Sequence, residues 1–215
     1  PTMRKLPLNT PTPAHTAQGL AGQSAKHDSA WKHVSGQARY IDDMPMPEGT
    51  LHAAVGHSQQ AHARVISMDL DAVRRHPGVI AVVTAKDVPG HLDIGPVFPG
   101  DPVLADDIVE FIGQPLFAVA ATSQEAARKA ARLANVEYER LDAVITVNQA
   151  LDKELFVRPT QTQLRGNPDQ ALANAPHRLT GEQVVGGQEH FYLEGQACLA
   201  EPTEDRGMFV HTSSQ

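Results

Sequence analysis

Chemically useful side chains are concentrated in one short stretch, Gly186–Glu194, and in Ser213-Ser214-Gln215 at the C-terminal end of the sequence. The stretch reads Gly-Gly-Gln-Glu-His-Phe-Tyr-Leu-Glu and is called the signature segment below. Its amide, carboxylates and imidazole are costly to bury unless each finds a hydrogen-bond partner, which indicates a segment positioned for binding. The alternative is an ordinary strand entered through a Gly-Gly bulge, in which Phe191 and Leu193 face a core and the polar side chains face away.

The rest of the chain offers few competing chemistries. Cys198 is the only cysteine, so this chain alone can build neither a disulfide nor a cysteine-ligated iron–sulfur or zinc cluster. The 11 histidines include no His-x-x-x-His or His-x-His pair, and no Gly-x-Gly-x-x-Gly or Walker sequence occurs. The sequence therefore predicts no direct metal ligand and no ordinary nucleotide site.

Charge and hydropathy exclude two classes of partner. The net charge is −7, from 25 acidic and 18 basic residues, and no run of Lys or Arg is present. Binding to nucleic acid or to an anionic membrane is therefore disfavoured. No apolar stretch approaches the roughly 20 residues that cross a bilayer, and the N-terminus lacks the order of a secretory signal. We expect a soluble protein of the reducing cytoplasm.

The signature segment resembles that of the large, molybdenum-binding subunit in the xanthine dehydrogenase and aldehyde oxidase family of molybdenum hydroxylases. Five further stretches resemble the same family in the same order: Val34–Asp43, Ala61–Ala63, Pro77–Val79, Thr84–Gly90 and Ile112–Pro115. Together the matches extend from about Ser29 to Gln215.

The resemblance implies an α+β fold with two domains. A small α/β hammerhead domain is expected at residues 35–150, followed at residues 151–215 by a linker and the first strands of a molybdopterin-binding domain. Residues 1–34 are rich in Pro, Thr, Gln and Ala and predict an extended N-terminal arm. This arm is either a tether to a neighbouring domain or subunit, or a loosely attached terminus.

The resemblance also assigns candidate site residues. It places on Gln215 a glutamine whose side-chain amide hydrogen-bonds the molybdenum centre, and an amide can donate without adding charge. Support of the cofactor pocket is the role expected for six signature residues: Gly186, Gly187, Gln188, Glu189, His190 and Glu194. The family's catalytic glutamate, its substrate-binding arginine and glutamate, and its Gly-Gly-Gly-Phe-Gly-Gly segment do not occur here. We therefore expect this segment alone to be inactive.

The function implied for the whole assembly is oxidation of hypoxanthine to xanthine and of xanthine to urate, with water as the oxygen source. Expected cofactors are molybdenum-molybdopterin in the large subunit, and 2Fe-2S centres and FAD on a partner small subunit, with NAD as the electron acceptor. Two alternatives stay open: a non-catalytic docking domain, and the same segment of an aldehyde or heterocycle hydroxylase. An independent hydrolase is disfavoured because no nucleophile motif is present.

The elements that must position these residues follow from local patterns. Strands are predicted by β-branched or alternating runs at residues 51–57, 64–68, 79–84, 116–121, 136–139, 143–147, 177–185 and 207–212. A first helix is predicted after Asp69, with that residue as its N-cap, and ends before Pro77-Gly78. Ser123 begins the clearest helix, with alanines along one face, and Asn167-Pro168 begins another. Residues 91–106, which are rich in Pro and Gly, predict an irregular loop.

Overall fold

The computed structural model describes residues 22 and 24–214, which divide into two units. The larger unit is Met46–Gly186, and the other combines the described residues of Pro1–Pro45 with those of Gly187–Gln215. Most of the predicted N-terminal arm lies outside the described residues. Its last residues enter helix α1 (Ala30–Ser35) instead of continuing in extended backbone.

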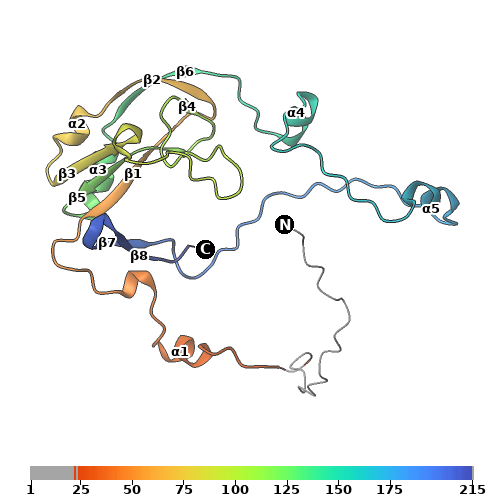
Figure 1. Cartoon of the computed structure of the whole chain (residues 1–215), viewed down its shortest axis with the longest axis horizontal. Helices are drawn as coiled ribbons and strands as arrows, with labels where there is room; N and C mark the ends of the chain where they lie inside the picture. Colours follow the sequence, from red (N-terminus) through yellow and green to blue (C-terminus); the bar gives the residue numbers. More distant parts are fainter. Residues whose placement is uncertain (1–21, 23, 215) are drawn as a thin grey trace, which may run out of the picture. The chain divides into compact units, whose positions relative to one another are not determined.

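Two three-stranded antiparallel sheets form the frame of the larger unit (Figure 1). In the first sheet, β5 (Pro115–Ala121) lies between β1 (His52–His57) and β3 (Val79–Thr84). In the second, β2 (Ala63–Asp69) lies between β4 (Ile108–Val109) and β6 (Asn135–Arg140). Strands β1, β2, β3, β5 and β6 confirm the sequence predictions for this region, whereas the two-residue strand β4 was not predicted. The short helix α2 (Asp71–Arg74) joins β2 to β3, which belong to different sheets.

Helix α3 (Gln124–Ala131) lies against β1 and β5 of the first sheet. It begins as predicted, because the Ser123 hydroxyl oxygen accepts the N–H of Ala126 at 3.2 Å. Ala127 and Ala130 are fully buried, and their small side chains allow the helix to approach the strands closely. The helix ends at Ala131.

One hydrophobic core joins both sheets and both of these helices. Its largest member, Phe117, is 1% exposed on the central strand β5. The other buried members are Ala63, Leu70, Val73, Ala105, Val109, Leu116, Val119 and Ala130. Because β2, β4 and β5 all contribute side chains to this core, the core stabilises both sheets together.

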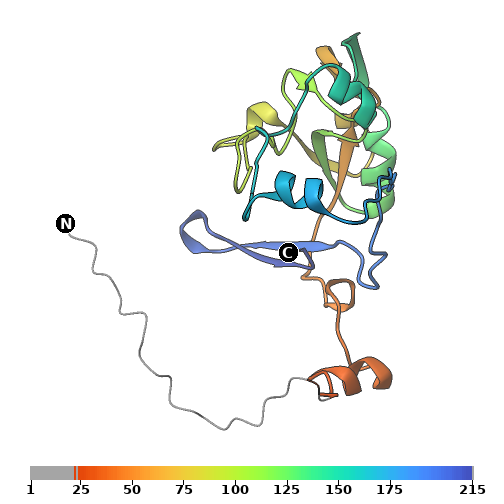
Figure 2. The same cartoon turned by 90° about the vertical axis from the view of Figure 1, so that its right-hand side faces the viewer.

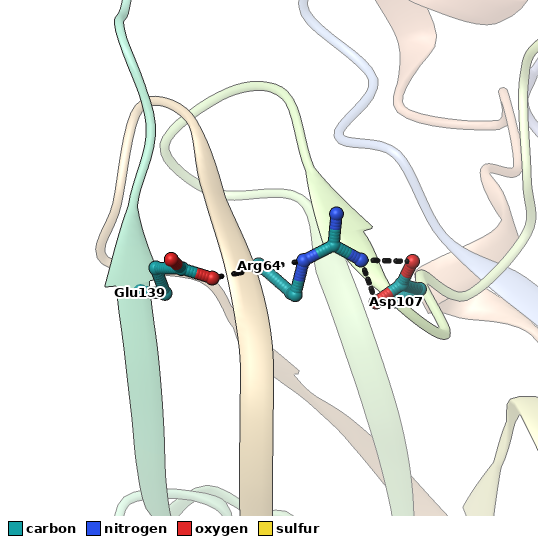
Figure 3. Close-up of polar contacts among 3 residues, drawn as sticks. All are labelled: Arg64, Asp107 and Glu139. Atoms are coloured by element: carbon teal, nitrogen blue, oxygen red, sulfur yellow. Dashed lines mark hydrogen bonds and ion pairs between the residues drawn. The ribbon is translucent and has the colours of Figure 1, made fainter.

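The second sheet is also held by charged side chains at its surface (Figure 3). Arg64 on β2 donates from one terminal nitrogen to both carboxylate oxygens of Asp107, at 2.9 and 2.7 Å. Its Nε lies 3.7 Å from a carboxylate oxygen of Glu139 on β6. Arg64 thus links β6 to the residue that precedes β4, although the exposure of all three side chains limits the energy gained.

The loop at residues 91–106 is irregular, as predicted, and is folded around one carboxylate. Asp93 accepts the backbone N–H groups of Gly95 at 2.9 Å, Gly100 at 2.8 Å and Asp101 at 3.4 Å. These bonds, the one from Gly95 foremost, lower the pKa of Asp93 below its usual value. A single side chain therefore closes the central turn of this loop.

The strand predicted at residues 143–147 is wrong. The chain instead begins helix α4 (Val147–Asp152), whose N-cap Thr146 accepts the N–H of Gln149 at 3.2 Å. The Gln149 side chain reaches back and accepts the N–H of Ile145 at 3.2 Å. This reciprocal capping favours a helix over the β-branched propensity of the same residues.

Helix α5 (Pro168–Asn174) begins as predicted, with the Asn167 side chain accepting the N–H of Gln170 at 3.0 Å. The strand predicted at residues 177–185 is absent, and the chain there has neither helix nor strand. A strand needs a neighbour for its backbone groups, and these residues have no hydrogen-bond partner among the described residues. The alternating pattern alone therefore did not specify a strand.

The smaller unit is built from α1, the 3-10 helix η1 (Ile41–Asp43) and an antiparallel hairpin. The hairpin pairs β7 (Cys198–Pro202) with β8 (Met208–Thr212) through a turn at η3 (Glu204–Arg206) (Figure 2). Strand β8 confirms the prediction for residues 207–212, whereas β7 was not predicted. Across residue 22 and residues 24–214, no helix combines the length and apolarity that a membrane crossing requires.

Candidate functional site

The signature segment is extended, irregular backbone rather than a strand. Its first five residues, from Gly186 to His190, are all exposed. Phe191 has φ 52, a left-handed conformation that turns the chain, and its side chain is 93% exposed. The alternative of a strand with Phe191 and Leu193 facing a core is therefore wrong, because Leu193 is also 85% exposed.

Glu194, the last residue of the signature segment, is the one signature residue that is partly buried. Its carboxylate oxygen Oε1 accepts the backbone N–H of Ile41 at 3.1 Å, across 153 residues of sequence. Ile41 is the first residue of η1, where N–H groups lack partners within the helix. A carboxylate suits this position because it satisfies an N–H group at a helix start. Glu194 therefore ties the signature segment to residues 40–43.

Ser213 makes a further tie, to residues that follow the signature segment. Its hydroxyl donates to the carbonyl oxygen of Gly195 at 2.9 Å and accepts the N–H of Ala197 at 3.1 Å. Gly195 directly follows the signature segment, and Ala197 lies three residues beyond its end. Residues 195–197, which follow the signature segment, and Ser213 are thus joined within the smaller unit. The sequence identified Ser213 only as part of a tripeptide, and no local pattern marks it as a tie.

Gln215, to which the resemblance assigns contact with the molybdenum centre, lies outside the described residues. Its neighbour Ser214 is exposed and hydrogen-bonds through its hydroxyl to the Thr212 hydroxyl at 3.0 Å. The role of Gln215 stays a prediction, as do the pocket-supporting roles of the signature residues.

The signature residues differ in whether they fit an anionic pterin cofactor. A Cβ atom at Gly186 or Gly187 would meet nothing within 4 Å, so the backbone there can be approached closely. Neither glycine N–H has a hydrogen-bond partner among the described residues, and Gln188 adds a neutral, exposed amide. Such neutral donors fit phosphate and oxygen groups. The carboxylate of Glu189 does not fit an anion.

Direct binding of a metal ion finds no support in the described ranges. Residues 22 and 24–214 contain no group of three or more His, Cys, Asp or Glu side chains placed to hold an ion. His190 and Glu194 form no such group with a third ligand. The donor set instead suits hydrogen bonding to a cofactor whose own atoms hold the metal.

Two family models match the chain one after the other. The model described as "Aldehyde oxidase and xanthine dehydrogenase, a/b hammerhead domain" matches residues 35–142. The model described as "Molybdopterin cofactor-binding domain" matches residues 147–215, which include the whole signature segment. The order agrees with the predicted fold class, and the boundaries at residues 150 and 151 stay predictions.

Individual proteins of the same family are also similar to this chain. A protein named xanthine dehydrogenase/oxidase from Gallus gallus is 37% identical over 199 residues, which are 92% of this chain and 15% of that protein. Aldehyde oxidase 4 from Cavia porcellus is 36% identical over 224 residues, which are 99% of this chain and 16% of that protein. The chain therefore spans about 15% of the length of these relatives.

A solved structure shares the fold over most of the chain. The aldehyde oxidoreductase from Desulfovibrio gigas superimposes with a TM-score of 0.73 at 28% identity. The match covers 87% of this chain and 23% of the other. The hammerhead fold and the beginning of a cofactor-binding domain are thus found together in a solved relative.

Proposed function

Because the chain belongs to the xanthine dehydrogenase and aldehyde oxidase family of molybdenum hydroxylases, we propose that it is part of the molybdenum-binding subunit of a xanthine dehydrogenase. The observation that carries this proposal is the succession of a hammerhead match and a molybdopterin-domain match along one chain. The whole enzyme oxidises hypoxanthine to xanthine and xanthine to urate.

The residues of this chain have two kinds of role in the proposal. The larger unit is architectural, since its core is closed and its buried residues are almost all apolar. Gly186, Gly187 and Gln188 offer neutral donors to the cofactor, and the Gln215 amide donates to the molybdenum centre without adding charge. The bound cofactor supplies the metal-centred hydroxylation chemistry, with water as the source of oxygen.

Electron transfer in the proposal requires groups that this chain cannot hold. Cys198 is its only cysteine, and a 2Fe-2S centre needs four ligands, so the iron–sulfur centres lie elsewhere. We assign them, together with FAD, to a partner small subunit, with NAD as the final acceptor. The remainder of the large subunit supplies the catalytic glutamate and the substrate-binding residues.

Aldehyde oxidation is a second candidate, favoured by a specific observation. Proteins named aldehyde oxidase match at 36–39% identity, and proteins named xanthine dehydrogenase match at 37–40%. Identity over this segment therefore does not separate the two substrates. A site for an aldehyde and a site for a purine differ in the groups that hydrogen-bond the substrate.

The test uses the complete enzyme purified with every chain that accompanies it. Molybdenum per large subunit is measured by elemental analysis, and kcat/KM is measured for xanthine and for benzaldehyde with NAD as acceptor. The proposal expects about one molybdenum per large subunit and a higher kcat/KM for xanthine. A higher value for benzaldehyde selects the second candidate. Absence of molybdenum contradicts both and leaves a docking domain.

A further inference from the structure

We propose that the outer face of the first sheet is a docking platform, covered in the complete enzyme by an apolar helix from the remainder of the large subunit. The inference rests on the proposed function, because it takes this chain as part of that subunit. It concerns the larger unit alone, and it assigns an occupant to a surface that the described residues leave open.

Six small apolar side chains form this platform. Strand pairing sets residues of β1, β5 and β3 directly opposite one another, and residues so paired share a face of the sheet. One row is Ala53, Ala120 and Ala81, and the other row is Val55, Ala118 and Val83. The rows are two residues apart along each strand, so they lie on the same face, about 7 Å from each other.

The platform is open, although every side chain on it is apolar. Val55 and Val83 are each 38% exposed, and Ala53 and Ala81 are also exposed. Even the two alanines of the central strand β5 are only partly buried. On the opposite face of the same strand, Val119 is fully buried. The sheet is therefore closed on one face and uncovered on the other.

The second sheet shows how a face exposed to water is composed in the same unit. There Arg64 lies opposite Glu139, and Ser67 on the same strand bonds through its hydroxyl to the Glu137 carboxylate at 2.9 Å. Polar residues are usual on the solvated face of an antiparallel sheet. The first sheet departs from this pattern with an unbroken apolar face, which indicates a surface that packs against a partner.

The width and composition of the platform fit a helix. Adjacent strands lie about 4.8 Å apart, so three strands span about 10 Å, close to the diameter of a helix with its side chains. Alanine and valine allow a helix to approach closely. Helix α3 already covers the opposite face of this sheet in the same way, with Ala127 and Ala130 fully buried. A second helix would complete a three-layer arrangement with both faces of the sheet covered.

The size of the platform favours a segment of the same subunit over a second copy of the chain. Its area is on the order of 100–200 Å², whereas a stable dimer buries about 800 Å² on each partner. A tethered segment needs less area, because its effective concentration is high. The relatives have ample length for such a segment, since this chain matches 15–16% of each. The platform carries no charge, so the facing side of the helix is apolar.

The experiment measures cysteine alkylation in the complete enzyme. Ala53→Cys and Ala81→Cys each place one thiol on the platform, on its two outer strands. Ser67→Cys is the matched control, because it places a thiol on the exposed polar face of the second sheet. Alkylation by iodoacetamide is followed by peptide mass spectrometry, which separates each introduced thiol from Cys198 and from every other cysteine.

Alkylation at positions 53 and 81 should be at least about 100-fold slower than at position 67. The protection should be independent of enzyme concentration and should persist in the separated large subunit, because the occupant is tethered. A photoreactive diazirine amino acid at Leu51 identifies the occupant. Leu51 is 44% exposed and continues the outward alternation of β1. It should cross-link to a peptide of the same subunit, outside residues 1–215, with apolar residues at helical spacing.

Four results overturn the inference: equal alkylation rates at positions 53, 81 and 67, protection that disappears on dilution, a cross-link to residues 1–215 or to the small subunit, or a cross-linked peptide without helical spacing. Protection lost on dilution would indicate a second copy of the chain. The Leu51 cross-link does not depend on the folding of the cysteine variants. Molybdenum content distinguishes the two proposals, since a loaded enzyme with a reactive platform refutes only the platform. Absence of molybdenum from the wild type refutes the proposed function.

Discussion

Replacement of Gly56 by alanine tests the packing between β1 and the core of the larger unit. Gly56 on β1 lies directly opposite Phe117 on β5. A Cβ atom at position 56 would lie 2.1 Å from both Cε1 and Cζ of the Phe117 ring, far inside van der Waals contact. The ring is 1% exposed and belongs to the central strand of its sheet, so it cannot move into solvent. Either the ring or the strand pair must shift.

The cost can be estimated from two opposing terms. Overpacking of a closed core costs about 1–3 kcal/mol. Replacing glycine in a strand recovers roughly 0.5–1 kcal/mol, because alanine restricts the unfolded chain. We therefore expect Gly56→Ala to lower the free energy of unfolding by about 1–2 kcal/mol, measured by urea titration with far-ultraviolet circular dichroism.

The matched control is Gly90→Ala. A Cβ atom there would meet nothing within 4 Å, and Gly90 has no positive φ. Its effect should stay within about 0.5 kcal/mol. The double variant Gly56→Ala/Phe117→Leu adds a second check, because Phe117→Leu removes the clashing ring atoms. The double variant should lose about 0.5–3 kcal/mol less stability than the two single variants lose together. Equal stability of Gly56→Ala and Gly90→Ala, or strict additivity of the pair, would refute the packing argument.

Two further predictions concern side chains that cap local structure. Asp93→Asn should accelerate amide exchange at Gly95 and Gly100, because a weaker acceptor replaces the carboxylate. Because folding lowers the pKa of Asp93, its ionised carboxylate stabilises the folded chain above pH about 4. This stabilisation is lost as the pH falls through the folded pKa. If Asp93→Asn kept the same acid dependence, Asp93 would not be its cause. Ser123→Ala should lower the free energy of unfolding, measured in urea, by about 1 kcal/mol, because it removes the cap on the Ala126 N–H. Ser123→Asp should keep the cap and therefore the stability. Equal loss of stability in both variants would exclude capping as the cause.

Local signals predicted the elements whose cause is local. Ser123 and Asn167 were identified as helix starts because a side-chain oxygen and its N–H partner are three residues apart in sequence. The buried strand β5 was predicted from an apolar run bounded by turn residues. Thr146 shows the limit of the same approach. Its capping partner Gln149 is equally close in sequence, but β-branched neighbours favoured a strand on propensity, and the cap decided the outcome.

Strands could be predicted only where the chain supplies a neighbour. Residues 177–185 alternate as a strand does, yet their N–H and C=O groups find no hydrogen-bond partner in the part of the chain that the structure describes. In contrast, β7 was missed, although its residues pair with β8. Alternation reports which side chains share a face, whereas the neighbouring strand decides whether a strand forms.

The candidate site also depends on contacts that local sequence patterns do not reveal. The sequence singled out the signature segment because burying its polar side chains would be costly. The structure leaves Gln188, Glu189 and His190 exposed, so that cost does not arise within this chain. The last residue of the segment is held by its carboxylate, which reaches Ile41 across 153 residues, and the next residue, Gly195, is held by the hydroxyl of Ser213. Neither contact follows from spacing, because each depends on chain segments brought together by folding. The polar composition therefore marked the segment without showing how it is held, and a role in binding stays a prediction. The tertiary contacts identify Glu194, and Ser213 through Gly195, as the side chains that hold the end of the segment and the residues that follow it.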